Sequence, residues 1–156
     1  MADSTYLKNV VEPFVVQWVS RRIGVVLQPR LIPVGPRTDG TPVNFEFDGV
    51  SEDGQIGLLV SASHTVKPGG TRKLHVDASI LLRAGFQRRL MAFVSPGVRQ
   101  NFQNKCDGLL ELSKIEMLVC DELTPVMQAS IAKFQAEAKS EVGDTGKQWK
   151  PGGQRW

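Results

Sequence analysis

The chain has 156 residues, 41% of them hydrophobic and 22% charged, a composition typical of a single globular domain of ordinary size. Its first residues are polar, and the apolar stretch Phe14–Val19 is far too short to span a bilayer. We therefore expect a cytoplasmic protein that does not act at a membrane. The two cysteines, Cys106 and Cys120, show no metal-ligand spacing and are expected to remain reduced thiols.

The formal net charge of +3 hides an uneven distribution along the chain. Residues 64–105 carry eight lysines and arginines against one acid, whereas residues 1–63 and 106–143 are both net acidic. A concentrated basic segment favours a polyanionic partner, because each phosphate that is neutralised releases counterions. We therefore predict binding to nucleic acid, with DNA as the expected form; the alternative is a solvated basic surface without a partner. The residues predicted to contact it are Lys67, Arg72, Lys73, Arg88 and Arg89.

The first predicted element is an amphipathic helix that Asp3 or Ser4 can cap and that Gly24 ends. Pro13 lies inside this pattern, so it either kinks the helix or begins a second one. A strand over 25–34 follows. It contains two prolines, which lack an N–H donor, and this predicts an edge strand or a strand with a bulge.

The next element is a hairpin within residues 42–63. Apolar residues at 43, 45 and 47 alternate with polar ones, the period of a half-buried strand. The Ser-Glu-Asp-Gly sequence at 51–54 predicts a tight turn, in which Gly54 is free to adopt positive φ. Residues 55–63 are apolar almost throughout, which predicts a strand covered on both faces.

The second half of the chain predicts three further helices and two strands, with residues 1–143 forming one domain and residues 144–156 a flexible basic tail carrying Trp149 and Trp156. Thr71 is a candidate cap for the first of these helices, and Thr124-Pro125 opens the last one, with Val126, Ile131, Phe134 and Ala138 buried. The expected ranges are a helix over 72–84, a strand over 90–94, a helix over 98–105, a strand over 115–120 and a final helix ending at 142–143.

This succession, with the hairpin FDGVSEDGQI and the later strand RRLMAFV, resembles the PD-(D/E)XK nuclease superfamily over roughly residues 5–140. The resemblance implies an α+β fold of restriction-endonuclease type. Its central mixed sheet would have about five strands flanked by helices, in the order αβββαβ followed by αβα. In active members, a helix acid, an Asp on the second strand and a Glu-x-Lys on the third gather a divalent metal.

Asp48 matches the second-strand Asp of that superfamily, and Glu12 is the candidate helix acid, so these two would hold the metal. The Glu-x-Lys position falls on Leu59-Val60-Ser61, where both functional residues are missing. In some members the lysine has moved to the following helix, and Lys73 or Lys67 is the candidate for that part, with Lys73 also able to form an i,i+4 ion pair with Asp77.

The sequence therefore leaves three functions open. The first is a catalytically inactive nuclease-like protein that binds nucleic acid or acts as an accessory or regulatory subunit, as in a defence, restriction or repair system. The second is an active Mg²⁺-dependent endonuclease that uses Asp48, Glu12 and Lys73. The third is a protein-interaction module, which could be a homodimer. No cofactor is expected for the first, and Mg²⁺ for the second.

Overall fold

The computed structural model describes residues 5–66 and 68–133. Its strands are β1 (Leu27–Pro36), β2 (Pro42–Ser51), β3 (Ile56–Ser61), β4 (Arg88–Phe93) and β5 (Glu116–Val119). Its helical elements are the π-helical turn η1 (Leu7–Val11), α1 (Glu12–Ile23), α2 (Pro68–Arg83), α3 (Pro96–Cys106) and the 3₁₀ turn η2 (Leu112–Lys114), and residues 125–133 are also helical.

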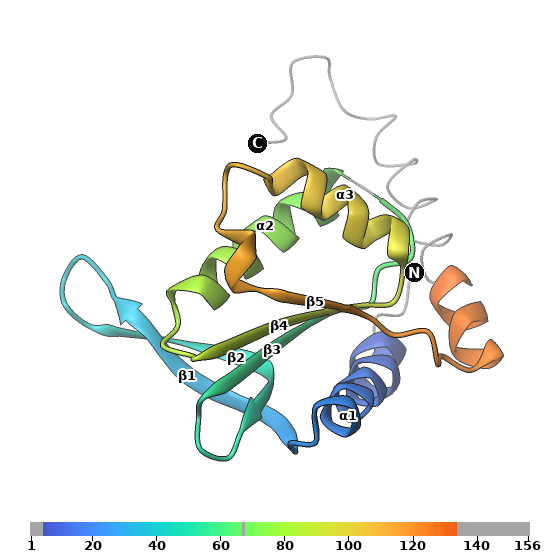
Figure 1. Cartoon of the computed structure of the whole chain (residues 1–156), viewed down its shortest axis with the longest axis horizontal. Helices are drawn as coiled ribbons and strands as arrows, with labels where there is room; N and C mark the ends of the chain where they lie inside the picture. Colours follow the sequence, from blue (N-terminus) through green and yellow to red (C-terminus); the bar gives the residue numbers. More distant parts are fainter. Residues whose placement is uncertain (1–4, 67, 134–156) are drawn as a thin grey trace.

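The five strands form one mixed sheet in the order β1-β2-β3-β4-β5. β2 is antiparallel to both of its neighbours, whereas β3, β4 and β5 run parallel. α1 lies on one face of the sheet, and α2 and α3 lie side by side on the other (Figure 1). The α+β class and the five-stranded mixed sheet flanked by helices confirm the prediction from the sequence.

Each face of the sheet has its own apolar core. On the α1 face, residues of the helix such as Val15 and Val19 pack on Leu58 and Leu90. On the opposite face, α2 and α3 pack over aromatic side chains of the sheet, and Phe47 lies 4.9 Å from Phe86 between ring centroids. β3 is therefore covered on both sides, as its continuous apolar sequence predicts.

The turn between β2 and β3 is held by side chains as well as by its glycine. The Ser51 hydroxyl donates to Asp53 at 2.7 Å and accepts from the backbone N–H of Ile56 at 2.9 Å. Gly54 has a φ of 74°, which confirms the predicted positive φ. This turn fixes the register of the hairpin that carries Asp48.

β1 is an edge strand, and its pairing with β2 slips twice, so both expectations drawn from its prolines are confirmed. The slip that matters for the site lies between two pairs, Gln28 with Val50 and Arg30 with Phe47. β2 advances three residues there while β1 advances two, so β2 contains a bulge of one extra residue. Asp48 lies within this bulge.

The first helical stretch consists of η1 followed directly by α1, and Pro13 lies in the first turn of α1. Of the two expectations for Pro13, a new helical segment is the one observed. The π-helical geometry of η1 precedes a residue that lacks an N–H donor, where regular α-helical bonding cannot continue. α1 ends at Gly24 in the left-handed conformation, with φ of 71°, as predicted.

α2 begins at Pro68, four residues before the predicted start, so Thr71 lies within the helix and does not cap it. Proline is favoured at the first helical position, and the glycines after it do not prevent the helix from starting there. Val126 is 69% exposed, which contradicts its predicted burial, whereas Ile131 is fully buried as predicted. Met127 and Ile131, four residues apart, face the core, and Val126 is displaced from their stripe.

Several predictions concern residues outside the part of the chain that the structure describes: the caps Asp3 and Ser4, Lys67, the buried positions Phe134 and Ala138, and the tail 144–156 with Trp149 and Trp156. Within the described residues, no helix combines the length and the apolar character that crossing a bilayer requires.

Candidate active site at the fork between β2 and β3

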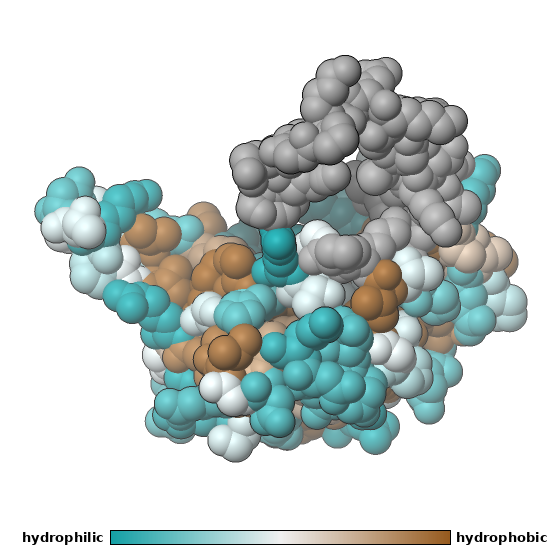
Figure 2. Space-filling view, turned by 90° about the horizontal axis from the view of Figure 1, so that it is seen from above, coloured by the Kyte–Doolittle hydropathy of each residue, from teal (hydrophilic) through white to brown (hydrophobic). Residues whose placement is uncertain are grey.

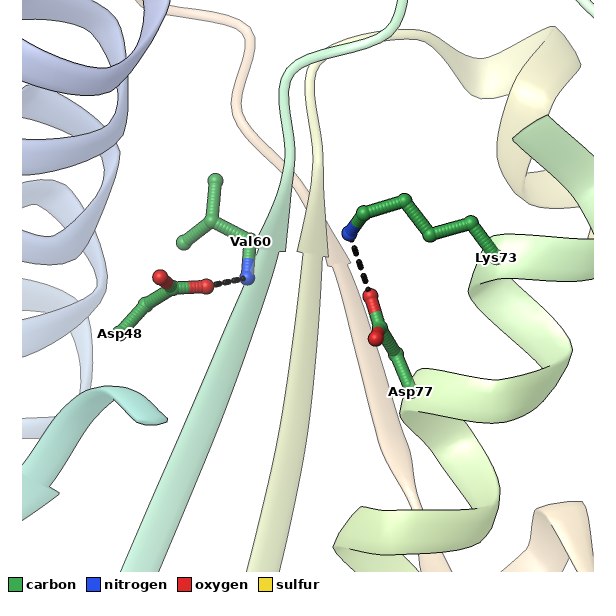
Figure 3. Close-up of polar contacts among 4 residues, drawn as sticks. All are labelled: Asp48, Val60, Lys73 and Asp77. Carbon is green, nitrogen blue, oxygen red and sulfur yellow. Dashed lines mark hydrogen bonds and ion pairs between the residues drawn. The ribbon is translucent and has the colours of Figure 1, made fainter. Parts of the chain in front are cut away.

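The candidate site lies where β2 and β3 separate. The two strands pair only through Gly49 with Leu58 and Val50 with Gly57, beside the turn that joins them. Beyond these pairs, the Asp48 carboxylate takes the place of a backbone acceptor: its Oδ2 accepts the N–H of Val60 at 2.7 Å (Figure 3). The carboxylate therefore holds the fork open and satisfies a strand donor that would otherwise be unpaired.

Glu12 approaches Asp48 from α1. Both carboxylates line the same cleft between α1 and β2, together with Glu46, which lies on the same strand as Asp48. Burial, and next the negative charge of Asp48, raise the pKa of Glu12 to about 6. Burial also raises the pKa of Asp48, and the hydrogen bond from Val60 partly opposes that shift. Two carboxylates that resist ionisation together are a common feature of acid–base and cation-binding sites.

The structure corrects the placement of the third-strand residues. Leu59 packs in the apolar core under α2, whereas Asp48 lines the cleft on the α1 side, so Leu59 does not stand beside Asp48. The residue that contacts Asp48 is Val60, through its backbone. The reason is the bulge. Counted from Val50, which faces α2, strict alternation would place Asp48 on the α2 side, beside Leu59. The extra residue puts Phe47 on the α2 side instead, so Asp48 faces α1.

Lys73 lies on α2, across β3 from Asp48 (Figure 3). Its ammonium group forms an ion pair with Asp77 at 2.8 Å, and its side chain is 74% exposed. The i,i+4 pair predicted from the sequence is therefore present. The positive charge of Lys73 nevertheless acts to lower the pKa values of both Glu12 and Asp48, so the three predicted catalytic residues share one electrostatic environment.

Glu12 borders two clefts. One, of about 530 Å³, runs between α1 and the start of β1 and also includes Lys8, Arg21 and Asp48. The other, of about 350 Å³, lies at the carboxyl end of β3, beside the first turns of α2 and α3. The carboxylate of Glu12 thus stands at the junction of these two clefts, where a substrate could reach it from either side.

The carboxylates of Glu12 and Asp48 could supply part of a Mg²⁺ site, but not a complete one. Among the described residues, no group of three or more His, Cys, Asp or Glu side chains is placed to hold a metal ion. Mg²⁺ in phosphoryl-transfer sites is often held by only one or two carboxylates together with substrate phosphates and water. Glu12 and Asp48 supply that number of carboxylates, and a bound cation would favour their ionised forms against the burial that raises both pKa values.

The predicted nucleic-acid-binding residues do not form one patch. Arg88 makes a bidentate ion pair with Glu116 on β5, at 2.6 and 2.9 Å. Arg89 donates to the carbonyls of Leu81 and Ala84, so it caps the C-terminal end of α2. Arg88 therefore ties β4 to β5, and Arg89 holds the end of α2 that is remote from Lys73, roughly 12–16 Å away along the helix axis.

Five other basic residues lie on α2 and α3, the two helices that pack side by side on one face of the sheet. Those two helices carry five basic side chains against one acid, Asp77. Four of the five are exposed, and Figure 2 shows this side of the molecule as largely hydrophilic, with hydrophobic patches toward the β1–β2 hairpin. All of them belong to the basic segment seen in the sequence, and the structure brings them together only as far as placing them on two neighbouring helices. They are Arg72, Lys73, Arg83, Arg99 and Lys105.

The sequence pointed to Glu12, Lys73 and Ser61 but not to the cleft at the carboxyl end of β3 that they line, nor to Asn101 on its α3 side. The only signal for this cleft was the position of Ser61 at the end of an apolar strand, where ligands of open α/β sheets often bind.

Comparison with known proteins identifies no relative. No protein-family model matches the chain, and neither a curated protein nor a solved structure matches it. The resemblance to the PD-(D/E)XK superfamily therefore stays a prediction from the sequence.

Proposed function

We propose that the protein binds nucleic acid through the outer surface of α2 and α3, on a nuclease-like fold whose metal site has lost its third-strand residues. The observation that carries the proposal is the helical pair itself. Its five basic side chains and single acid, net +4, lie on two adjacent helices on one face of the sheet. Such a surface attracts phosphate backbones without requiring base contacts.

The arrangement at the fork between β2 and β3 supports the proposal that the metal site is incomplete. The backbone of Val60 contacts Asp48, and the neighbouring strand positions on that face, Leu58 and Ala62, are apolar. Neither a carboxylate nor an ammonium group from β3 joins Glu12 and Asp48. Such a protein would bind a nucleic-acid strand near the fork between β2 and β3 but would lack the full set of groups that cleavage needs. It would therefore act as a binding or accessory subunit.

One specific observation favours a second candidate, a Mg²⁺-dependent nuclease. Glu12, Asp48 and Lys73 are coupled electrostatically although they come from three different elements. In that case Glu12 and Asp48 would hold the cation, which would polarise a phosphate oxygen and lower the pKa of a bound water. Lys73 would place its positive charge near the attacked phosphate, after exchanging its ion pair with Asp77 for the substrate.

One set of assays separates the two candidates. Fluorescence anisotropy with duplex DNA, single-stranded DNA and RNA across a salt series measures binding, and gel analysis of the same substrates with Mg²⁺ or Mn²⁺ measures cleavage. The proposal expects salt-dependent binding without cleavage, and unchanged binding by Asp48→Asn. Cleavage by the wild type that disappears in Asp48→Asn would establish the nuclease instead. The absence of binding to all three substrates would reject both.

A further inference from the structure

The cleft at the carboxyl end of β3 has the features of a ligand site in its own right. Its volume of about 350 Å³ lies at the small end of the range for small-molecule pockets, roughly 300–1,000 Å³. Leu7, Val60 and Leu74 give it an apolar floor. Residues of η1, α1, β3, α2 and α3 all line it, so a bound group would be surrounded by five elements.

Ser61 supplies a buried polar group without a use inside the protein. The residue is only 9% exposed and lines the cleft. Within the part of the chain that the structure describes, its hydroxyl makes no hydrogen bond, and the oxygen itself is not fully buried, so it opens onto the cleft. A hydroxyl that opens onto the cleft and makes no bond within the protein is free to donate to a ligand there.

Further donors reach the same cleft from the helices. Asn101 of α3 accepts a hydrogen bond from the Thr71 hydroxyl through its Oδ1, at 3.2 Å, which leaves its amide NH₂ to donate. Gly70 of α2 also lines the cleft, in the first turn of a sixteen-residue helix, where backbone N–H groups have no partner within the helix. A Cβ added at Gly70 would meet nothing within 4 Å, so a ligand can approach this backbone closely.

These groups are donors, and they enter from three elements: the Ser61 hydroxyl from β3, the Asn101 amide from α3 and the Gly70 N–H from α2. Lys73 adds a positive charge at the edge of the cleft, and the helix N-terminus favours an anion. The one carboxylate in the lining is Glu12, on the α1 side, which can accept hydrogen bonds from sugar hydroxyls as acidic residues do in nucleotide sites.

We propose that this cleft binds a phosphate monoester, carried either by a free nucleotide or by the end of a nucleic-acid strand. A monoester presents three terminal oxygens to the converging donors, whereas a phosphodiester within a strand presents two. The five elements that enclose the cleft also favour the end of a nucleic-acid strand, because a continuous strand would have to enter the cleft and leave it again. The strand-end form rests on the proposed nucleic-acid binding, whereas the free-nucleotide form does not.

The test uses the full chain and two pairs of probes. AMP is compared with adenosine by calorimetry, and an oligonucleotide with a terminal phosphate, at the 5′ or the 3′ end, is compared with its unphosphorylated counterpart by anisotropy. The variants Ser61→Ala and Asn101→Ala each remove one donor. Their matched controls are Ser79→Ala, whose hydroxyl bonds only within α2, and Asn104→Ala on the exposed side of α3. Thermal unfolding of every variant verifies that it folds.

We expect a preference for the phosphorylated member in at least one pair, and a loss of roughly ten- to hundred-fold in its affinity in Ser61→Ala and Asn101→Ala. The two control variants should retain the wild-type affinity. No preference for phosphate in either pair, or equal affinities of cleft and control variants, would overturn the proposal. If oligonucleotides bind in a salt-dependent way but with the same affinity with and without the terminal phosphate, and AMP binds no better than adenosine, the cleft site alone is overturned. If AMP binds but oligonucleotides do not, the cleft site is supported and the proposed function is rejected.

Discussion

Replacing Glu12 by glutamine should stabilise the protein at neutral pH. The pKa of Glu12 is raised from 4.5 to about 6 by burial and by the neighbouring Asp48 charge. A difference of about 1.5 in pKa corresponds to about 2 kcal/mol, at about 1.36 kcal/mol for each unit. Because the side chain is only half-buried, solvent screening reduces this, and we expect a gain of about 1 kcal/mol in the free energy of unfolding.

The sign of the pH dependence follows from the direction of the shift. A carboxylate with a raised pKa binds its proton more tightly in the folded state, so folding is most favourable below the unfolded value, near 4.5. Stability is then lost as the pH rises toward about 6, and the penalty stays constant above that value. Glu12→Gln removes the ionisation, so its gain should be present above pH 6 and absent below pH 4.5.

Chemical denaturation at several pH values measures this gain, with Glu52→Gln as a matched control on the exposed turn between β2 and β3. The control should change the free energy of unfolding by less than about 0.5 kcal/mol at every pH. A destabilised Glu12→Gln variant at neutral pH, or a gain that does not depend on pH, would refute the placement of Glu12 beside Asp48.

Three further substitutions test the fork and the two cores by chemical denaturation. Asp48→Ala should lower the free energy of unfolding by about 1–3 kcal/mol because the Val60 N–H loses its acceptor, and a neutral effect would contradict the bond. Gly57→Ala should cost about 1–3 kcal/mol, since its Cβ would overlap the Phe86 ring, and an unchanged stability would reject that packing. Ile131→Ala should cost about 2–5 kcal/mol, and a smaller loss would place the helix over 125–133 away from the core.

The arrangement of the strands follows closely from local sequence chemistry. The turn at 51–54, the proline-containing edge strand and the doubly covered β3 each have a signal within a few residues. Period-2 alternation gave the faces of Phe45 and Phe47 correctly, since both pack under α2. The start of α2 was misplaced because a Pro-Gly-Gly sequence has the composition of a loop, although proline is well suited to the first helical position.

The site was harder to derive, because it depends on contacts between distant elements. The sequence named Glu12, Asp48 and Lys73, but not that the Val60 backbone contacts Asp48. That contact depends on the bulge in β2, which changes which side chains share a face and leaves no pattern in β2 alone. The roles of Arg88 and Arg89 were equally hidden, because their acceptors lie on β5 and at the end of α2.

The central claim is that the cations of α2 and α3 bind a nucleic-acid backbone, and the slope of log affinity against log salt concentration tests it most directly. The double variant Arg72→Gln/Lys105→Gln removes two charges from that face, and Arg21→Gln/Arg22→Gln removes two from α1 on the opposite face. We predict that the first weakens binding and lowers the slope by about one for each phosphate that the protein no longer neutralises, while the second leaves both nearly unchanged. Equal slopes for the two variants, or a wild-type affinity that does not depend on salt, would contradict the claim.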